Sequence, residues 1–542
     1  MAHPNLRWTH DVRTCLAFVM VETLAASLAC ASDWYVDQSY SGCGTGSGGP
    51  NDPFCTIGDA LNVAADGDTI HIAPGSYLEA IRIFSADVTL VGTRGPSVTK
   101  VLYGNPGLSL LRVEQGASAR VIGLSFEHGL SNLDGGGVYV TEGSSLSLED
   151  CVVADCAAAQ YGYGGGIYNL GSLKMLRTTL RGNDAYYGGG LFDKSSGTQG
   201  LRIENCVITG NTASWSGGVY LYSSLPARID ATTISDNDAS AGGGGMGVLA
   251  QDIELWNCTI SGNTARSAGA LLTGTTVQSP PNVRFFHCKV SGNRADDHGG
   301  TDSQGTLLFW SSTVAGNVAT YGSGGGIYSV SGTVFIGHTV VADNSAQMGP
   351  DCYGTLTSTG YNLIEDTADC TIIGDPTGNL LGVDPLLSGL ADNGGRTMTH
   401  HLLPGSPARD AGDPSITKGK DQRGGSRVLD GNCDGVAVRD MGAVEAGLTL
   451  IAEPTTLREG DVGELLTDDG EPFTYSLLII TAVDGIETSF PIDFGLLSDQ
   501  GRRSISMVVP PGLSGRSMKL RAFAFDPCFE PRGSDPVRID FR

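Results

Sequence analysis

The chain has 542 residues, of which 79 are glycine and only 17% are charged. This composition differs from that of an average globular protein and favours a repetitive β fold with many tight turns. A formal net charge of −25 argues against nucleic-acid binding, because a phosphate backbone requires a positive protein surface.

The first 31 residues are predicted to be a secretory signal. Arg7 and Arg13 supply the positive region, residues 15–21 and 24–29 the apolar core, and Ala29-Cys30-Ala31 a cleavage site between small residues. The mature chain would then begin near Ser32. Residues 27–30 resemble a lipoprotein box only loosely, because the apolar and small residues stand in the wrong order, so free secretion is favoured over a lipid anchor at Cys30.

Beyond this segment, no apolar run is long enough to span a membrane as a helix. The 13 cysteines are spread along a large chain, which fits an oxidising destination and not a small disulfide-stapled scaffold.

Residues 35–83, from YVDQSY to EAIRI, resemble the opening of bacterial pectin-lyase-like β-helix proteins. The resemblance implies a short amphipathic cap helix at about 57–65, followed by strands at 69–72 and 80–83. A cap is needed because an open end would expose the apolar core and unpaired strand edges. Cys43 and Cys55 flank the preceding loop and are expected to pair.

A repeat of 24 to 30 residues organises the middle of the chain. One asparagine marks each copy, and a small residue precedes it by five positions. A Gly cluster follows it and leads into a further short strand. The asparagines are Asn183, Asn211, Asn237, Asn263, Asn293, Asn317 and Asn344, and Cys156 takes this place in the first copy.

Each copy holds about three short strands and is too small to bury a core alone, so the copies are predicted to stack in register as a parallel β-helix. Stacking would align the asparagines in a hydrogen-bonded ladder. The small residues, which include Cys206, Cys258 and Cys288, are interpreted as buried fillers, with a catalytic or metal-binding role as the less favoured alternative.

The Gly-Gly-Gly-Ile and Ser-Gly-Asn steps of these repeats resemble those of polymorphic outer-membrane proteins. Residues 340–446 resemble the bacterial choice-of-anchor Q domain through DCYGTLTSTGYNLIEDTADC, then VDPLLSGLADNGGRTMTHHLLPGSPARDAGD, DQRGG and DMGAVE. The resemblance implies a secreted or surface-displayed β-helix and supplies no established activity. Cys352 and Cys370 bound the first of these motifs, and we expect them to pair.

Residues 447–542 carry alternating runs such as SISMVV and SMKLRAFAF between Pro, Gly and Asp turns. This pattern predicts a small β-sandwich domain, acting either as a cap or spacer or as a recognition module.

Two groups of acidic residues are candidates for a catalytic or a metal site. Asp296, Asp297, His298 and Asp302 are candidate catalytic residues, although a solvated turn explains them more simply. Asp430, Asn432 and Asp434 precede Gly435 as in the start of a calcium loop, but Met441 stands where such a loop carries Glu, so a polar turn is favoured over a calcium site. No other cofactor is expected. Of His400 and His401, one is expected to be buried and hydrogen-bonded.

Aromatic residues recur just after the asparagine position, at Tyr161 and Tyr163, at Tyr186 and Tyr187, at Trp215 and at Tyr321. In register, Tyr163, Tyr187 and Trp215 would form a strip on one edge of the rod and could hold sugar rings. A structural clasp over the Gly turns is the other interpretation and is favoured over ligand binding.

The expected fold is therefore an all-β, right-handed parallel β-helix of residues 32–446 with an N-terminal helical cap, followed by the small β-sandwich. The predicted function is a secreted or cell-surface scaffold, without catalysis, that binds a polysaccharide, a cell-surface glycan or a partner along its side. The alternative, a polysaccharide lyase or glycoside hydrolase, rests on fold analogy alone.

Overall fold

The computed structural model describes residues 31–447, except 43–45, 85, 103–106, 197–199, 250–251, 275–279 and 433, together with strands between residues 449 and 541. The predicted signal segment, apart from its last residue, lies outside the described residues, as does Cys43. Within the described part of the chain, no helix is long and apolar enough to cross a membrane.

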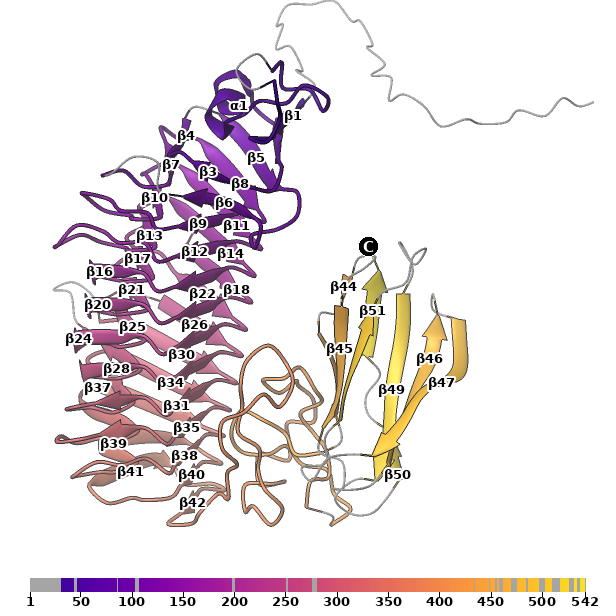
Figure 1. Cartoon of the computed structure of the whole chain (residues 1–542). Coiled ribbons are helices and arrows are strands. Elements are labelled where there is room, and N and C mark those ends of the chain that lie inside the picture. Colours follow the sequence, from indigo (N-terminus) through magenta and orange to yellow (C-terminus); the bar gives the residue numbers. More distant parts are fainter. Residues whose placement is uncertain are drawn as a thin grey trace, which may run out of the picture.

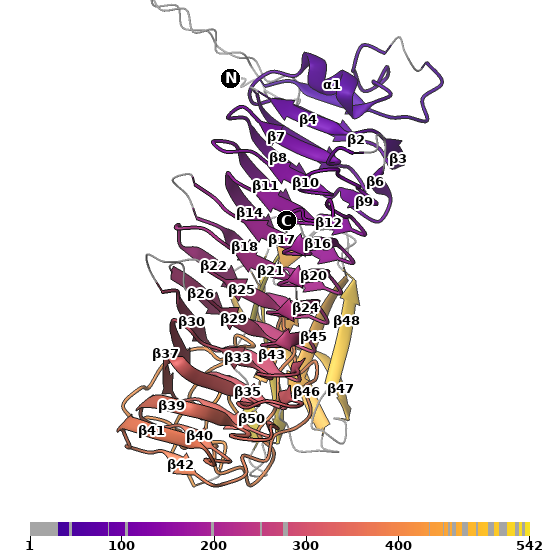
Figure 2. The same cartoon turned by 90° about the vertical axis from the view of Figure 1, so that its left-hand side faces the viewer.

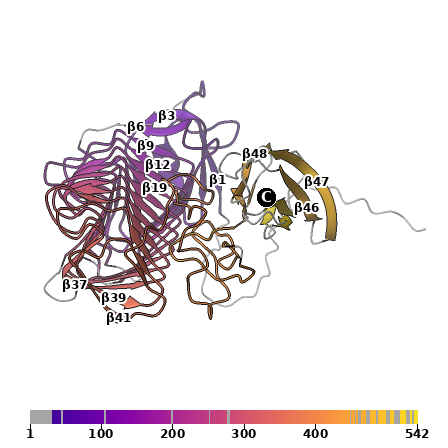
Figure 3. The same ribbon diagram turned by 90° about the horizontal axis from the view of Figure 1, so that it is seen from below.

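Residues 33–381 form a rod of stacked coils in which the inter-strand pairing is parallel throughout (Figure 1). A complete coil has four short strands, here called faces I to IV. In one coil these are β13 (Ile167–Asn169), β14 (Ser172–Leu176), β15 (Thr179–Arg181) and β16 (Asp184–Tyr187). Viewed from below, the strands of successive coils superimpose (Figure 3). The sequence predicted three strands per coil, and the fourth is the short strand that carries the aromatic positions.

Faces I and II belong to one sheet of 23 strands. Besides β13, face I contains β4 (Ile81–Phe84), β7 (Leu111–Glu114), β10 (Val138–Val140), β17 (Leu191–Asp193), β21 (Val219–Leu221), β25 (Met246–Val248), β29 (Leu271–Thr273) and β33 (Thr301–Asp302). Besides β14, face II contains β1 (Asp33–Val36), β2 (Thr69–Ile72), β5 (Asp87–Gly92), β8 (Ser118–Ile122), β11 (Ser145–Glu149), β18 (Arg202–Glu204), β22 (Ala227–Asp230), β26 (Asp252–Trp256), β30 (Asn282–Phe286), β34 (Thr306–Trp310) and β41 (Cys370–Asp375). The long strands β37 (Ile327–Gly337) and β39 (Cys352–Thr359) run through both faces.

Face III is a sheet of 13 strands and face IV a sheet of six. Besides β15, face III contains β3 (Gly75–Leu78), β6 (Thr99–Leu102), β9 (Ser125–Glu127), β12 (Val152–Ala154), β19 (Val207–Thr209), β23 (Thr233–Ser235), β27 (Thr259–Ser261), β31 (Lys289–Ser291), β35 (Thr313–Ala315), β38 (Val340–Ala342), β40 (Leu363–Ile364) and β42 (Leu380–Leu381). Besides β16, face IV contains β20 (Thr212–Trp215), β24 (Asp238–Gly242), β28 (Thr264–Ser267), β32 (Arg294–Ala295) and β36 (Val318–Ala319).

The N-terminal end is capped by α1 (Ile57–Val63), as the sequence predicted. Thr56 caps the helix by accepting a hydrogen bond from the amide of Asp59 at 3.0 Å. Ile57 and Ala60 are fully buried against the first coil, so the helix covers its apolar end.

The interior of the rod is apolar because side chains alternate along each strand. In β11 and β14, Leu146, Leu148, Leu173 and Met175 point inward, and each sits directly on its counterpart one coil away. The predicted asparagine ladder is confirmed at the turn between faces III and IV, where each side-chain amide from Asn183 to Asn317 donates to the side-chain oxygen of the next asparagine at 2.9 Å.

The regular coils end at β42, whereas the sequence analysis extended the β-helix to residue 446. Residues 382–447 carry no named strand. They fold back along face III beside β31, β35 and β38, where Figure 1 shows them as the orange segment, and we call residues 384–446 the side module. Burial reflects this docking. In β19, Val207 is exposed and Thr209 partly exposed, whereas β27, β31, β35 and β38 are buried at every position.

The predicted pair Cys352–Cys370 forms a disulfide with a Cα–Cα distance of 5.4 Å. Cys55 is also disulfide-bonded, but Cys43 is outside the described residues, so the pair Cys43–Cys55 stays a prediction.

The strands after the side module are antiparallel, apart from the short pairing of β44 with β51. They form two sheets, as a β-sandwich requires. The first sheet has β43 (Thr449–Glu453), β45 (Val462–Asp468) and β48 (Arg503–Val508); the second has β44 (Thr456–Leu457), β46 (Tyr475–Val483), β47 (Ile486–Leu496), β49 (Ser517–Phe525), β50 (Pro531–Gly533) and β51 (Val537–Phe541).

Candidate functional site: an aromatic groove

Two of the predicted aromatic residues, Tyr187 and Trp215, end the face IV strands β16 and β20, and Tyr163 holds the matching position one coil earlier, outside any named strand. Tyr163 bridges to Tyr187, and Tyr187 is the register partner of Trp215. Figure 2 shows these strands, β16 and β20, beside face I. A Gly-rich turn then leads directly into face I. Gly188 at this turn has a φ of +65°, and a Cβ there would lie 2.4 Å from the carbonyl oxygen of Leu191, so glycine is required.

A second aromatic row, which the sequence analysis missed, lies on face I. Tyr168, Phe192 and Tyr220 are register partners in β13, β17 and β21, and their side chains point outward. The ring centroids of Phe192 and Tyr220 are 5.2 Å apart, with planes inclined by 14°. The signal was present in the repeated Gly-Ile-Tyr, Gly-Leu-Phe and Gly-Val-Tyr steps, where the third residue must face away from the core.

The two rows meet across the turn and enclose a hollow of about 280 Å³. Tyr163 contacts Phe192 with a centroid distance of 4.7 Å, and it stacks on Tyr187 at 5.2 Å. The hollow is lined by Tyr163, Tyr168, Tyr187, Phe192, Lys194, Tyr220 and Tyr222. Phe192 is nearly fully buried, whereas Tyr163, Tyr187 and Tyr220 are half-buried, so aromatic surface reaches solvent.

A second hollow of about 340 Å³ continues along the same edge, and Tyr187 and Tyr220 line both. Trp215 forms one wall and Leu272 the other. Between them, Gly247 takes the position in β25 that Tyr220 holds in the preceding coil. A Cβ at Gly247 would lie 2.0 Å from Ser216 Oγ and 2.9 Å from Cδ2 of Tyr220, so glycine leaves room for these two side chains, and the hollow lies beside them. We call the two hollows together the aromatic groove.

A buried polar network lies beneath the groove. Asp193 follows Phe192 in β17, and its carboxylate accepts hydrogen bonds from Asn169 Nδ2 at 2.5 Å and from Ser195 Oγ at 3.0 Å. Burial raises the pKa of Asp193 to about 6, against the lowering effect of these hydrogen bonds. The network holds the end of β17, which carries Phe192 and is followed directly by Lys194.

The candidate catalytic residues do not form one cluster. His298 Nδ1 lies 3.3 Å from Asp302 Oδ2, and the His298 ring stacks on Tyr328 with a centroid distance of 3.7 Å. Asp296 and Asp297 are exposed on the preceding turn. The structure therefore brings together one His–Asp pair and not the two carboxylates that glycosidic hydrolysis uses.

In the candidate calcium loop, the side chains bind the loop's own backbone. Asp430 accepts from the amide of Gly435 at 3.2 Å, Asn432 from Asp434 at 3.0 Å, and Asp434 from Val436 at 2.8 Å. These are the hydrogen bonds of a polar turn. Calcium binding by Asp430, Asn432 and Asp434 stays a prediction.

His400 has the expected buried, hydrogen-bonded role. Its Nδ1 lies 2.7 Å from the carbonyl oxygen of Ser388 and its Nε2 lies 2.8 Å from Ser291 Oγ. It therefore joins the side module to face III.

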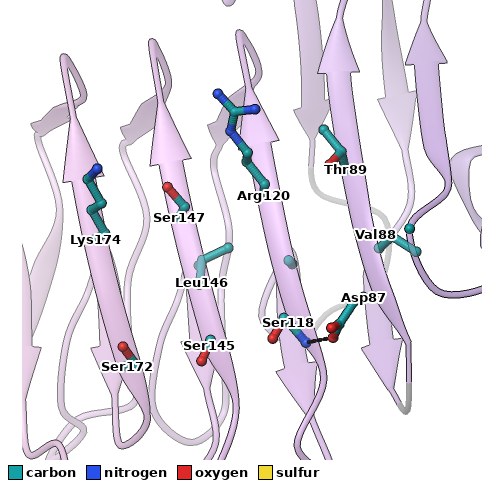
Figure 4. Close-up of a pocket in the computed structure, with 12 residues that line it drawn as sticks. Asp87, Val88, Thr89, Ser118, Arg120, Ser145, Leu146, Ser147, Ser172 and Lys174 are labelled. Atoms are coloured by element: carbon teal, nitrogen blue, oxygen red, sulfur yellow. Dashed lines mark hydrogen bonds between the residues drawn. The ribbon is translucent and has the colours of Figure 1, made fainter. Parts of the chain in front are cut away.

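A separate, polar hollow of about 380 Å³ lies on the outer face of β5, β8, β11 and β14 (Figure 4). Thr89, Arg120, Ser147 and Lys174 form one row, and a second row of shorter side chains runs parallel to it. The Arg120 guanidinium donates hydrogen bonds from Nε and Nη2 to the Glu149 carboxylate, at 2.9 and 2.8 Å. Asp87 is the single carboxylate among the lining residues, and it accepts from the amide of Ser118 at 3.0 Å. The residues described as lining this hollow therefore include one carboxylate and not the pair that glycosidic chemistry uses.

Comparison with known proteins agrees with the fold. Residues 136–373 match the family model described as a right-handed β-helix region, and the rod is a right-handed parallel β-helix. No curated relative matches the sequence significantly.

Among solved structures, the chain is similar to a pectin methylesterase from Erwinia chrysanthemi, with 11% identity, 54% of this chain and 90% of that chain covered, and a TM-score of 0.30. It is also similar to a rhamnogalacturonan lyase, with 12% identity, coverage of 69% and 96%, and a TM-score of 0.33. These likenesses are remote and assign no activity.

Proposed function

We propose that this protein is a secreted, non-catalytic scaffold that binds an extended carbohydrate in the aromatic groove. The observation that carries the proposal is the pair of aromatic rows, Tyr163–Tyr187 and Tyr168–Phe192–Tyr220, which contact each other and together line a hollow that reaches solvent. Aromatic faces present flat apolar surface against which the C–H faces of sugar rings pack.

The length of the groove favours an extended ligand. From the coil of Tyr163 to that of Leu272 there are four inter-strand steps of about 4.8 Å, or roughly 19 Å in total. Polar groups stand at the rim, where Lys194 Nζ lies 5.5 Å from the centre of the Tyr222 ring. Tyrosine hydroxyls and Lys194 add hydrogen-bonding groups to the aromatic faces of the hollow, and this combination suits a sugar ring.

Absence of catalysis is supported by the arrangement of the acidic residues. Asp302 is paired with His298, and Asp296 and Asp297 are exposed on a turn, so the region offers no facing pair of carboxylates. Secretion is supported by the signal pattern of residues 1–31 and by the Cys352–Cys370 disulfide, since such bonds persist in oxidising compartments. The motifs of residues 340–446 support membership of the choice-of-anchor Q family.

Binding is tested by passing the purified mature protein over immobilised polygalacturonate, xylan and cellulose, with and without calcium. We expect retention on at least one of these polysaccharides, and the double variant Tyr187→Ala/Trp215→Ala should lose it while keeping its β-sheet circular dichroism and melting temperature. Tyr321→Ala is the matched control, because Tyr321 is an exposed tyrosine of a later coil outside the groove.

Two results would overturn the proposal. If the well-folded double variant is retained as strongly as the wild type, the groove does not bind. If the double variant melts several degrees lower, the aromatic residues act as a clasp. Release of oligosaccharides from any of the three polysaccharides would instead support the lyase or hydrolase alternative.

A further inference from the structure

A pocket of about 370 Å³ lies between the rod and the side module, and it shares no residue with the aromatic groove. The rod contributes the turns that follow face II in successive coils, including Asn205, Ala231, Asn257 and His287. The side module contributes Arg396 and the segment 420–424. We call this space the junction pocket.

Three cationic side chains line the junction pocket, Arg396, Lys420 and Arg423, against one carboxylate, Asp421. The carboxylate is already engaged. It accepts from Arg423 Nε at 2.9 Å and from the backbone amides of Arg423 and Gly425 at 2.9 and 3.0 Å. Arg396 and Lys420 are exposed. The lining is therefore positive in a chain whose net charge is −25.

Buried charged groups lie behind the pocket, and Arg427 is among them, close to the carboxylates of Asp421 and Glu445. Its Nε and Nη1 have no hydrogen-bond partner among the described residues. Burial, together with the charges of Arg427 and Arg439, lowers the pKa of His287 to about 3. His287 Nδ1 likewise has no hydrogen-bond partner in the described structure. Buried cations in a region of low dielectric act strongly on a neighbouring anion.

The pocket does not offer a platform for stacking a sugar ring. Trp256 lines the pocket, but its ring already has stacking partners. The Phe286 ring stacks on it with a centroid distance of 4.2 Å, and the Arg228 guanidinium lies over it, 5.2 Å from the indole centre. Trp256 Nε1 donates to Glu254 at 3.2 Å. Recognition here therefore depends on charge and hydrogen bonds, unlike that in the aromatic groove.

We propose that the junction pocket binds a small organic anion through a carboxylate or phosphate group. Arg396 and Lys420 meet the charged group, and Asn205 and Asn257 line the remainder of the pocket. The volume lies within the usual range of small-molecule sites, and ionised donors and acceptors form the stronger class of hydrogen bond.

The test uses the full mature chain and calorimetric titration with three probes, namely galacturonate, inorganic phosphate and galactose, at low ionic strength. Galactose is the uncharged counterpart of galacturonate. We expect saturable binding of at least one anion, no binding of galactose, and an affinity that falls as salt is raised to about 0.3 M.

Two pairs of variants locate the site. Ala231→Glu places a carboxylate in the floor and should weaken anion binding by about tenfold or more, whereas Ala231→Gln, of similar size, should change it by less than about threefold. Lys420→Ala should weaken binding by about fivefold, and Lys418→Ala, an exposed lysine two residues away that does not line the pocket, by less than about twofold.

Each possible result either supports or overturns the proposal of an anion site. Binding of galacturonate alone identifies a sugar acid, and binding of phosphate as well identifies a general anion site. The proposal is overturned by equal binding of galactose, by no binding of either anion at millimolar concentration, or by equal effects of the two lysine variants. Should Ala231→Glu fail to fold, the lysine pair still gives the answer.

Discussion

The side-chain amide of Asn237 donates to Oδ1 of Asn263, one coil away, at 2.9 Å and to the carbonyl oxygen of Ile208 at 3.0 Å. Its own Oδ1 accepts from the side-chain and backbone amides of Asn211 at 2.9 and 3.0 Å. Asn237 is fully buried, so all its polar atoms are satisfied by neighbouring coils. The ladder ends at Asp351, which accepts from Asn344 Nδ2 at 2.9 Å.

Replacing Asn237 by Leu should lower the free energy of unfolding by about 1–3 kcal/mol, because the amide of Asn211 and the carbonyl of Ile208 would lose their partner while buried. Urea denaturation of wild type and variant measures the difference. Asn432→Leu, in an exposed turn, is the control and should shift the midpoint little. An unchanged midpoint for Asn237→Leu would mean that the ladder does not contribute to stability.

Removing the Cys352–Cys370 disulfide should destabilise the last coils. The bridge spans 18 residues and joins β39 to β41, and closing a loop of this size contributes about 3 kcal/mol. The double variant Cys352→Ala/Cys370→Ala should lose about 2–4 kcal/mol. Non-reducing peptide mapping of wild type checks the bridge itself, and it also tests the predicted pair Cys43–Cys55; free thiols at either pair would contradict that assignment.

The five cysteines Cys151, Cys156, Cys206, Cys258 and Cys288 should be inert in the folded protein. All are buried and free. Burial raises the pKa of Cys151, Cys156 and Cys206 to about 12 and that of Cys258 well above its usual value, so almost no thiolate forms at neutral pH. Alkylation followed by peptide mass spectrometry should label them only in denaturant. Rapid labelling of Cys206 or Cys258 in native protein would revive a reactive role for these positions.

The sequence was sufficient for features that repeat along the rod. Asn237 and its counterparts are predictable because a stacked coil places identical residues in identical surroundings, so periodicity in sequence is periodicity in space. Tyr168, Phe192 and Tyr220 recur just as regularly. A short strand with one aromatic residue can place that residue in the core or on the surface, so the sequence did not show that they form an outward row.

The contacts between the side module and the rod could not be predicted from the periodicity of the repeat. Lys289 lies in β31, at a position that is at least partly exposed in the coils of β12, β15, β19 and β23, yet it is fully buried. Its Nζ donates to Thr313 Oγ1 at 2.9 Å and to the carbonyl oxygen of His400, 111 residues along the chain, at 3.4 Å. No local pattern marks a partner at that separation. The junction pocket depends on the same docking and was missed for the same reason.

His400 gives this interface a pH dependence whose sign follows from its pKa. Burial, and then the charge of Lys289, lower the pKa of His400 from 6.5 to about 4, although its hydrogen bond to Ser388 opposes the shift. Between pH 6.5 and 4 the unfolded chain therefore binds a proton at this site that the folded chain does not. The stability contributed by neutral His400 is present above pH 6.5 and is lost as pH falls toward 4, by up to about 3 kcal/mol.

His400→Gln removes this titration while keeping a neutral hydrogen-bonding side chain. Measured by urea denaturation, the variant should be less stable than wild type at pH 7.5, because the hydrogen bonds to Ser291 and Ser388 are disturbed. The difference should shrink steadily between pH 6.5 and 4.5, since only wild type loses stability through His400. Comparing the two proteins at each pH cancels the other titrating groups of the interface, such as Asp440 and Glu445. A difference that stays constant from pH 7.5 to 4.5 would show that His400 titrates alike in the folded and unfolded chains.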